Sequence, residues 1–205
     1  MEIIYSKFYA TLVNSGVFIL MKVGKKMVQL RKITHDNFDA VMELSMTDEQ
    51  KGNVDSSIYC LAKAYVKILN DEKPPMIFAI CNNDEVIGYV DIGFYELSED
   101  SFLSKKYGDK YTYGINRFMI DKKHQGKGFG KQAMMKVIEY IETFPQGQAD
   151  AVATSYWLVN EAVRKLFASV GFVETGAIWD GQTGDNWNVG RKDIEYAEVG
   201  ARLGL

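Results

Sequence analysis

Residues 115–130 read INRFMIDKKHQGKGFG, and this stretch decides which fold the chain can adopt. Its apolar beginning is typical of a buried strand, and the glycine-rich loop at 125–130 leads directly into helical spacing. Such a loop directs several backbone N–H groups outward at a helix N-terminus, a geometry that binds phosphate. The stretch therefore predicts a strand, a phosphate-binding loop and a helix in succession.

The spacing of the glycines argues against two familiar phosphate motifs. A dinucleotide fingerprint needs Gly-x-Gly-x-x-Gly after the first strand of a βαβ unit, whereas Gly126, Gly128 and Gly130 follow a strand in mid-chain. A nucleoside-triphosphate loop needs Gly-Lys followed by Ser or Thr, and here Gly126-Lys127 is followed by glycine. A phosphate ligand of another type fits this loop better.

Composition narrows the class of protein. The chain has 205 residues, 47% hydrophobic and 25% charged, which suits one compact domain. Its net charge of −3 offers no basic surface for nucleic acid. With two histidines, His35 and His124, a histidine metal site or hydrolytic triad is not expected. Cys60 and Cys81 are the only cysteines, which favours reduced thiols and a cytoplasmic protein that needs no metal.

The N-terminal segment stands apart from the rest. Its apolar run at 17–21 is too short to span a bilayer and lacks a small-residue cleavage site, so no membrane partner is expected. Met21 and Met27 could each start translation. We expect an extension over 1–26, either a misassigned start or an added strand or dimer contact, and one domain over 27–205.

The periodicity predicts a mixed α/β domain in the order β-α-α-β-β-β-α-β-α-β-β. One helix is expected to bury an apolar stripe formed by Ile58, Leu61, Ala62, Tyr65, Val66 and Leu69. Consecutive strands predict an antiparallel meander, and the later βαβ part allows a parallel pair. The predicted strands cover 27–33, 76–81, 86–95, 111–120, 151–156, 172–179 and 194–203. Four helices are predicted: one after Thr34 as N-cap, one over 58–69, one over 130–144, and one from Asn160 as N-cap to Gly171 at C′.

Two motifs resemble those of the GNAT family of N-acetyltransferases. Gln125, Gly128 and Gly130 match its acyl-CoA loop, Gln/Arg-x-x-Gly-x-Gly/Ala. The later family pattern Asn-x-x-Ala-x-x-Leu-Tyr-x-x-x-Gly-Phe is matched by Asn160, Leu166, Gly171 and Phe172, with Ala162 displaced by one position. The resemblance covers about residues 27–205. It implies a twisted, mostly antiparallel mixed sheet flanked by about four helices, with strands that splay at the acyl-CoA site.

The resemblance also implies acetyl-CoA as co-substrate and says which residues would hold it. Backbone groups of the preceding strand would contact the pantetheine arm, N–H groups of the loop would bind the pyrophosphate, and Asn160 would hydrogen-bond the pantetheine. The expected contacts are therefore Phe118, Met119, Ile120, Gln125, Gly126, Lys127, Gly128, Phe129, Gly130, Lys131 and Asn160.

The catalytic groups depart from the family pattern. Phe167 stands where the family has a tyrosine that protonates the leaving thiolate, and a phenyl ring cannot donate a proton. Either the thiolate leaves unaided, or Tyr113 or Tyr156 supplies the proton, or the activity is weak or lost. Gly114 stands at a strand position that often carries the base, which leaves Asp91 as the best inward carboxylate.

The acceptor is harder to read. Residues 117–128 and the segment Asp48-Glu49-Gln50 are similar to bacterial diamine and polyamine acetyltransferases. We therefore expect direct attack by a small di- or polyamine in a ternary complex, with Glu49, Asp91 and Asn116 holding the amine. An aminoglycoside-like antibiotic, an amino acid or a protein N-terminus is the alternative acceptor, and a non-catalytic acyl-CoA-binding protein is the alternative class. The resemblance also implies a homodimer.

Overall fold

The computed structural model describes residues 28–50, 56–70, 72–99, 101, 104–105, 108–180 and 195–202. The predicted segment 1–26 lies outside these residues. The order of elements is confirmed, with one added 3-10 turn. The elements are β1 (Val28–Lys32), α1 (Phe38–Met42), η1 (Asp48–Gln50), α2 (Ser57–Leu69), β2 (Met76–Asn82), β3 (Glu85–Glu96), β4 (Tyr111–Ile120), α4 (Phe129–Ile141), β5 (Ala151–Trp157), α5 (Glu161–Ala168), β6 (Val173–Asp180) and β7 (Glu195–Arg202).

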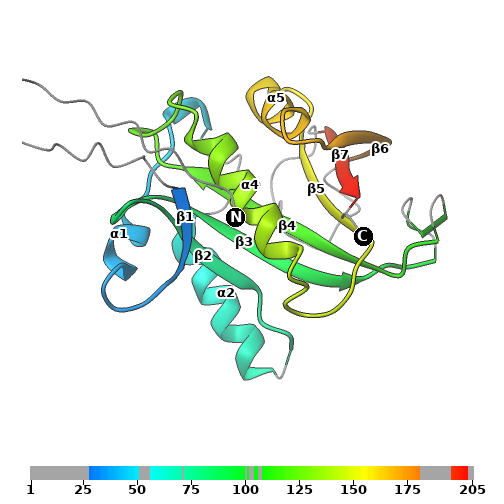
Figure 1. Ribbon diagram of the computed structural model, residues 1–205, viewed down its shortest axis with the longest axis horizontal. Coiled ribbons are helices and arrows are strands. Elements are labelled where there is room, and N and C mark those ends of the chain that lie inside the picture. Colours follow the sequence, from blue (N-terminus) through cyan, green and yellow to red (C-terminus); the bar gives the residue numbers. More distant parts are fainter. Residues whose placement is uncertain are drawn as a thin grey trace, which may run out of the picture.

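The strands form one seven-stranded sheet in the order β1-β2-β3-β4-β5-β7-β6, as Figure 1 shows. The first four strands are antiparallel neighbours, and β4 and β5 form the parallel pair that the βαβ pattern predicts. Helices α1 and α2 cover one face of the sheet and α4 covers the other (Figure 1). The predicted mixed, mostly antiparallel fold is therefore confirmed.

Strands β4 and β5 stay together over only a short distance. Their register contains three residue pairs, which end at Gly114 and Ala153. The Thr154 hydroxyl still donates to the Ile115 carbonyl at 2.7 Å. Beyond that bond β4 runs on to Ile120 with no described strand paired to it on the β5 side. The sheet thus splits in its middle, as the resemblance predicts.

Each face of the sheet has its own apolar core. On the α4 face the core joins β1–β5 to α4 and α5. On the opposite face a smaller core joins Val41 of α1 and Cys60 of α2 to Tyr89 and Met119 of the sheet. Because side chains alternate along a strand, neighbouring residues of β3 and β4 reach opposite cores. This alternation decides which side chains can meet near the split.

The predicted apolar stripe of α2 is wrong. Four of its members, Ile58, Tyr65, Val66 and Leu69, are more than half exposed, and α2 instead turns Ser57 and Cys60 inward. The Ser57 hydroxyl donates to the Val41 carbonyl at 2.8 Å. Small inward side chains let the helix approach α1 and β3 closely, and hydrophobic periodicity could not separate two faces that both carry apolar residues.

Helix boundaries differ from prediction in three places. Helix α1 begins after Asn37 rather than Thr34, because a turn closed by the Thr34 carbonyl precedes it. Helix α4 ends at Ile141, short of 144, where Phe144 has a φ of 51°. A residue before proline is disfavoured in a helix, and Pro145 follows. Gly171, with a φ of 94°, lies two residues beyond the C-cap Ser169 rather than at C′.

Candidate functional site

The glycine loop leads directly from β4 into α4. Gly126 and Gly128 have φ angles of 71° and 80°, which residues with a Cβ rarely adopt, and Gly128 is the N-cap of α4. The first N–H groups of a helix have no partner within it, so the start of α4 presents donors to a ligand. Phe129 is buried in the core, so it can offer a ligand only its backbone.

The side chains of the other predicted loop residues are either bonded within the loop region or exposed to solvent. The Gln125 amide donates to the Ile120 carbonyl at 2.8 Å, which ties the loop back to the end of β4. The Lys127 ammonium donates to the Lys123 carbonyl at 2.6 Å, within the loop itself. Lys131 is exposed on the first turn of α4. The cradle is therefore mainly backbone, with lysine charge around it.

Gln125 makes a second connection that the sequence did not reveal. Its side chain and that of Gln50 bond reciprocally, with N···O distances of 2.8 and 3.1 Å. A parallel tie lies nearby, where the Asp121 carboxylate accepts the Ser45 N–H at 2.9 Å. These bonds join the connection between α1 and α2 to the end of β4. The bonded residues lie about 75 positions apart in the sequence, so no local sequence pattern predicts these bonds.

Phe118, Met119 and Ile120 lie on the part of β4 beyond the split. Phe118 and Ile120 pack on the α4 side, and Met119 packs against the α2 side. Their side chains are thus committed to the two cores. What remains for a ligand in the split is the backbone, as the prediction requires.

Helix α5 closes the far side of this region. Asn160 is its N-cap, as predicted, and its side-chain oxygen accepts the Val163 N–H at 3.2 Å. The capping bond uses only the side-chain oxygen. The hydrogen bond from the Asn160 side-chain nitrogen to a ligand stays a prediction. A Cβ on Gly130 would lie 3.8 Å from Leu166, so the start of α4 packs closely on α5.

Phe167 is buried on α5, between Tyr156 and Phe172, with ring centroids 6.3 and 5.1 Å away. The Tyr156 hydroxyl donates to Glu174 at 2.7 Å, and Arg164 holds the same carboxylate at 2.8 Å. Burial, together with the bond and charge of Glu174, raises the pKa of Tyr156 to about 12. A phenol of that pKa is a poor acid for a thiolate of pKa ~8.5.

Tyr113 is fully buried on the α4 side of the sheet. Its hydroxyl donates to the Gly147 carbonyl at 2.8 Å and accepts the Gln146 N–H at 3.0 Å. Its ring packs edge-on against Phe94. These contacts favour packing over proton donation. Neither tyrosine candidate therefore offers a well-placed acid.

Asp91 and Asn116 lie together on the α2 face. The Asn116 side-chain nitrogen donates to the Asp91 carboxylate at 3.1 Å. Asn116 has no partner on β3, because Asp91 pairs with Arg117 and Ile92 pairs with Ile115. This β-bulge sits just past the split and turns the Asn116 side chain toward Asp91. Two predicted acceptor residues are thus brought together.

The electrostatics around Asp91 are mixed. Burial raises the pKa of its carboxyl group, while the Asn116 hydrogen bond and the charges of Arg117, Lys67 and Lys63 act against that rise. Glu49 lies on η1 and is exposed. The structure therefore groups Asp91 with Asn116, while Glu49 lies apart on the α1–α2 connection.

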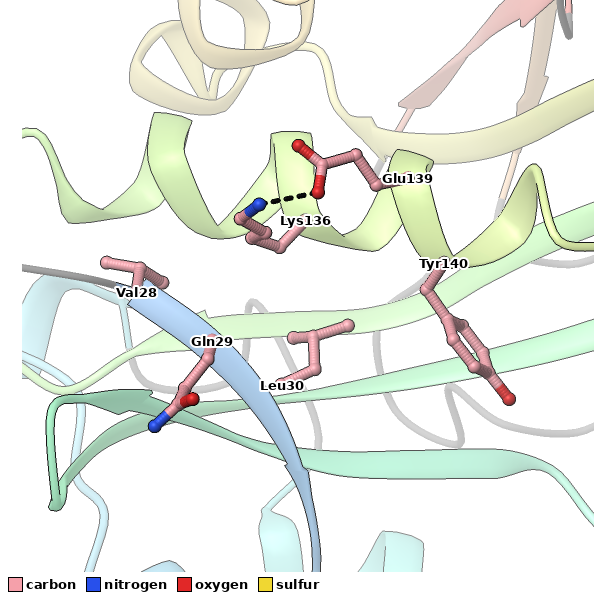
Figure 2. Close-up of a pocket in the computed structure, with 6 residues that line it drawn as sticks. All are labelled: Val28, Gln29, Leu30, Lys136, Glu139 and Tyr140. Carbon is pink, nitrogen blue, oxygen red and sulfur yellow. Dashed lines mark hydrogen bonds and ion pairs between the residues drawn. The ribbon is translucent and has the colours of Figure 1, made fainter. Parts of the chain in front are cut away.

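A cavity of about 360 Å³ lies elsewhere, between β1 and α4, and Figure 2 shows its lining. Lys136 and Glu139 pair with each other at its rim, beside Val28, Leu30 and Tyr140. No predicted site residue lines it. Among the described residues, no cluster of His, Cys, Asp or Glu is placed to hold a metal ion. No helix in the described part of the chain is long and apolar enough to cross a membrane.

Comparison with known proteins agrees with this geometry. A family model described as "Acetyltransferase (GNAT) family" matches residues 38–172. A probable spermine N(1)-acetyltransferase of Bacillus subtilis subsp. natto is 28% identical over 115 residues, covering 56% of this chain and 68% of the relative.

Two solved structures share the fold at low sequence identity. Spermidine N-acetyltransferase from Vibrio cholerae, in complex with CoA and spermine, superposes with a TM-score of 0.60 at 17% identity, covering 87% of this chain and 97% of that one. Aminoglycoside N(6′)-acetyltransferase from Legionella pneumophila gives 0.61 at 15% identity, covering 88% and 95%.

Proposed function

The chain belongs to the GNAT family and is an acetyl-CoA-dependent N-acetyltransferase, and from this premise we propose that its acceptor is a small di- or polyamine. The observation that carries the proposal is the buried Asp91 carboxylate, which Asn116 holds at the bulge beside the split of β4 from β5. A thioester lying in that split would reach the α2 face at the bulge, where Asp91 and Asn116 meet.

The residues present fit acetyl-CoA. The loop with Gly126 and Gly128 offers backbone N–H groups to a pyrophosphate, and residues 116–120 of β4 offer backbone groups to a pantetheine arm. Asn160, at the start of α5, would hydrogen-bond the same arm. Acetyl-CoA supplies the activated acetyl group, and the chain's contribution is to bind and orient it.

Direct attack fits the chain's nucleophiles. Cys60 and Cys81 are both buried in the core under α2, and burial raises the pKa of the Cys81 thiol. A buried thiol is a poor nucleophile, so an acyl-cysteine intermediate has no suitable carrier among these residues. The amine nitrogen bonds to the thioester carbon, the C–S bond breaks, and sulfur leaves with the electron pair. The amine's proton passes to solvent, and water protonates the thiolate.

A cationic acceptor is supported by the carboxylates near the bulge and by the relatives. Asp91 is positioned by Asn116, and Glu49 with Asp48 gives the α1–α2 connection negative charge. The curated relative is named for spermine, and the Vibrio cholerae structure holds spermine. Carboxylates attract and orient ammonium groups, so a polyamine would be held by one amine while another attacks.

A second acceptor class is favoured by a different observation. Arg117, Lys63 and Lys67 all act electrostatically on Asp91, so cations also surround this surface. An amino acid, which carries a carboxylate beside its amine, would suit that mixture of charge better than a polycation.

An amine panel separates these acceptors. Purified protein is mixed with acetyl-CoA and with spermidine, spermine, putrescine, an aminoglycoside or single amino acids, and release of CoA thiol is followed. We expect the largest kcat/KM with spermidine or spermine. A higher value with an amino acid would replace the polyamine proposal, and binding of CoA without release with any amine would favour a non-catalytic protein.

A further inference from the structure

Tyr95, near the end of β3, stands beside the bulge. Its hydroxyl donates to the Asn116 side-chain oxygen at 2.7 Å, and Asn116 donates in turn to Asp91. Three polar side chains from β3 and β4 thus form one chain, which begins at a buried carboxylate. Tyr95 itself is 39% exposed, so this chain of hydrogen bonds ends at a partly exposed residue.

Two glycines make the place of this ring possible. A Cβ on Gly93 would lie 2.4 Å from the Tyr95 hydroxyl oxygen, and a Cβ on Gly114 would lie 2.6 Å from its ring. Real Cβ atoms do not approach so closely, so any side chain at either position would displace the ring. Gly93 and Gly114 face each other across β3 and β4. The Tyr95 ring therefore fills the space that a side chain at Gly114 would take.

The position of Gly114 shows where the Tyr95 ring lies relative to the split between β4 and β5. Gly114 is the last residue of β4 in register with β5, so the ring lies where the split begins. Gly114 stands at the position that often carries the base in the family, and the Tyr95 ring covers it. Burial raises the pKa of Tyr95, so its hydroxyl keeps its proton and cannot serve as a base at neutral pH. The hydroxyl proton is directed at Asn116, which leaves the oxygen's lone pairs for another donor.

We propose that the Tyr95 hydroxyl oxygen accepts a hydrogen bond from the attacking amine and orients its nitrogen toward the thioester, an inference that rests on the proposed acetyl transfer. Asp91 orients Asn116, and Asn116 fixes the phenolic O–H, so that hydrogen bonds along the chain strengthen one another. Tyr95 takes up no proton in this step. Its part is to select and orient an N–H donor.

Tyr95→Phe tests the proposal, because it keeps the ring over both glycines and removes the hydroxyl. With the best amine from the panel, we expect kcat/KM for the acceptor to fall about 10- to 100-fold. The KM for acetyl-CoA, the affinity for CoA and the melting temperature should stay near wild-type values. Tyr65→Phe, on the exposed side of α2, is the matched control and should leave all four quantities unchanged.

Three results would overturn the proposal. Wild-type acceptor kinetics in Tyr95→Phe would show that the hydroxyl does not touch the amine. An equal loss of acetyl-CoA affinity would assign Tyr95 a structural role instead. A wild-type protein that acetylates no amine fails the proposed function itself, and the Tyr95 inference falls with it.

Discussion

The glycine loop and the surface around Asp91 lie near one strand, yet they are built in opposite ways. The loop is one continuous segment, 125–131, that would act mainly through its backbone. The Asp91 surface is assembled from side chains of β3 and β4, joined by hydrogen bonds across a bulge. A continuous backbone site can be recognised as a motif, whereas an assembled site exists only after folding. The two regions should therefore respond differently to substitution.

The largest effect should come from the backbone site. Gly128→Val places a Cβ on a residue with a φ of 80°, which strains the N-cap of α4 by about 1–2 kcal/mol and crowds the ligand's approach. We expect the dissociation constant for CoA to rise about 30-fold or more, measured by isothermal titration calorimetry.

Gly108→Val is the matched control for that change. Gly108 has a φ of 73° with open space around it, so the strain is similar but lies far from the loop in sequence. Loss of stability without loss of CoA affinity is expected there. Equal CoA affinity in Gly128→Val and wild type would show that the loop is not the phosphate cradle.

The next effect concerns the bond between Asp121 and Ser45, which joins the α1–α2 connection to the end of β4. The Asp121 carboxylate is buried, which opposes ionisation, but N–H groups of Lys123 and Ser45 and the Ser45 hydroxyl outweigh burial and lower its pKa. Its contribution to stability is thus present above pH ~3.8 and lost as pH falls through the lowered pKa. Asp121→Asn should reduce the free energy of unfolding by about 1–3 kcal/mol at pH 7.

Urea denaturation at pH 7 and at acidic pH measures this tie. The difference between Asp121→Asn and wild type should shrink as the wild-type carboxylate becomes protonated. Asp84→Asn provides the control, because Asp84 is 95% exposed in its pair with Arg31 and should change stability by less than about 0.5 kcal/mol. A pH-independent difference at Asp121 would contradict the role of its charge.

The contribution of Asp91 to stability should change with pH in the opposite direction to that of Asp121. Burial raises its pKa, so the ionised carboxylate costs stability at neutral pH; stability is greatest below pH ~3.8 and falls as pH rises through the folded-state pKa. Asp91→Asn should raise the melting temperature at pH 7 by about 2–4 °C, for a gain of about 1 kcal/mol, and weaken acceptor binding. Calorimetry measures the melting temperature, and the acceptor KM measures binding. A lower melting temperature in Asp91→Asn would contradict the expected cost of burying the ionised carboxylate.

The smallest effect should come from Gln50. Gln50→Leu removes the reciprocal amide bonds to Gln125 without touching the glycine loop itself. Each such bond is worth about 0.5–1.5 kcal/mol, so we expect the CoA dissociation constant to rise about threefold. Gln29→Leu, which removes an exposed bond to the Asn83 carbonyl, should leave it unchanged. No change in Gln50→Leu would mean that the α1–α2 connection does not support the glycine loop.

Much of the fold could be predicted because its signals are local. Glycines at 126 and 128, the Asn160 N-cap and alternating strands each act within a few residues, and the structure bears them out. The face of α2 could not be predicted, because it depends on how closely Ser57 and Cys60 let the helix approach α1 and β3. Apolar residues on both sides of that helix removed the contrast on which periodicity relies.

The candidate site divides in the same way. Asp91 and Asn116 were found from strand alternation, which places side chains on a face but not in contact. The bulge that brings them together adds one residue to β4, and a pattern of period two cannot foresee it. Strand alternation places Tyr95 on the same face as Asp91, but its proposed role could not be predicted because it depends on two glycines on adjacent strands. Glycines that face each other across a strand pair beside an aromatic residue are the signal that could have revealed it.

The short parallel seam between β4 and β5 also has a mechanical consequence. Within the sheet, three residue pairs and the Thr154–Ile115 hydrogen bond join the half that carries β1–β4 to the half that carries β5–β7. A ligand bound in the gap would contact both halves and link them reversibly. Binding would then stabilise the folded protein by RT ln(1 + [L]/Kd), where [L] is the free ligand concentration, so the gain grows with the logarithm of that concentration.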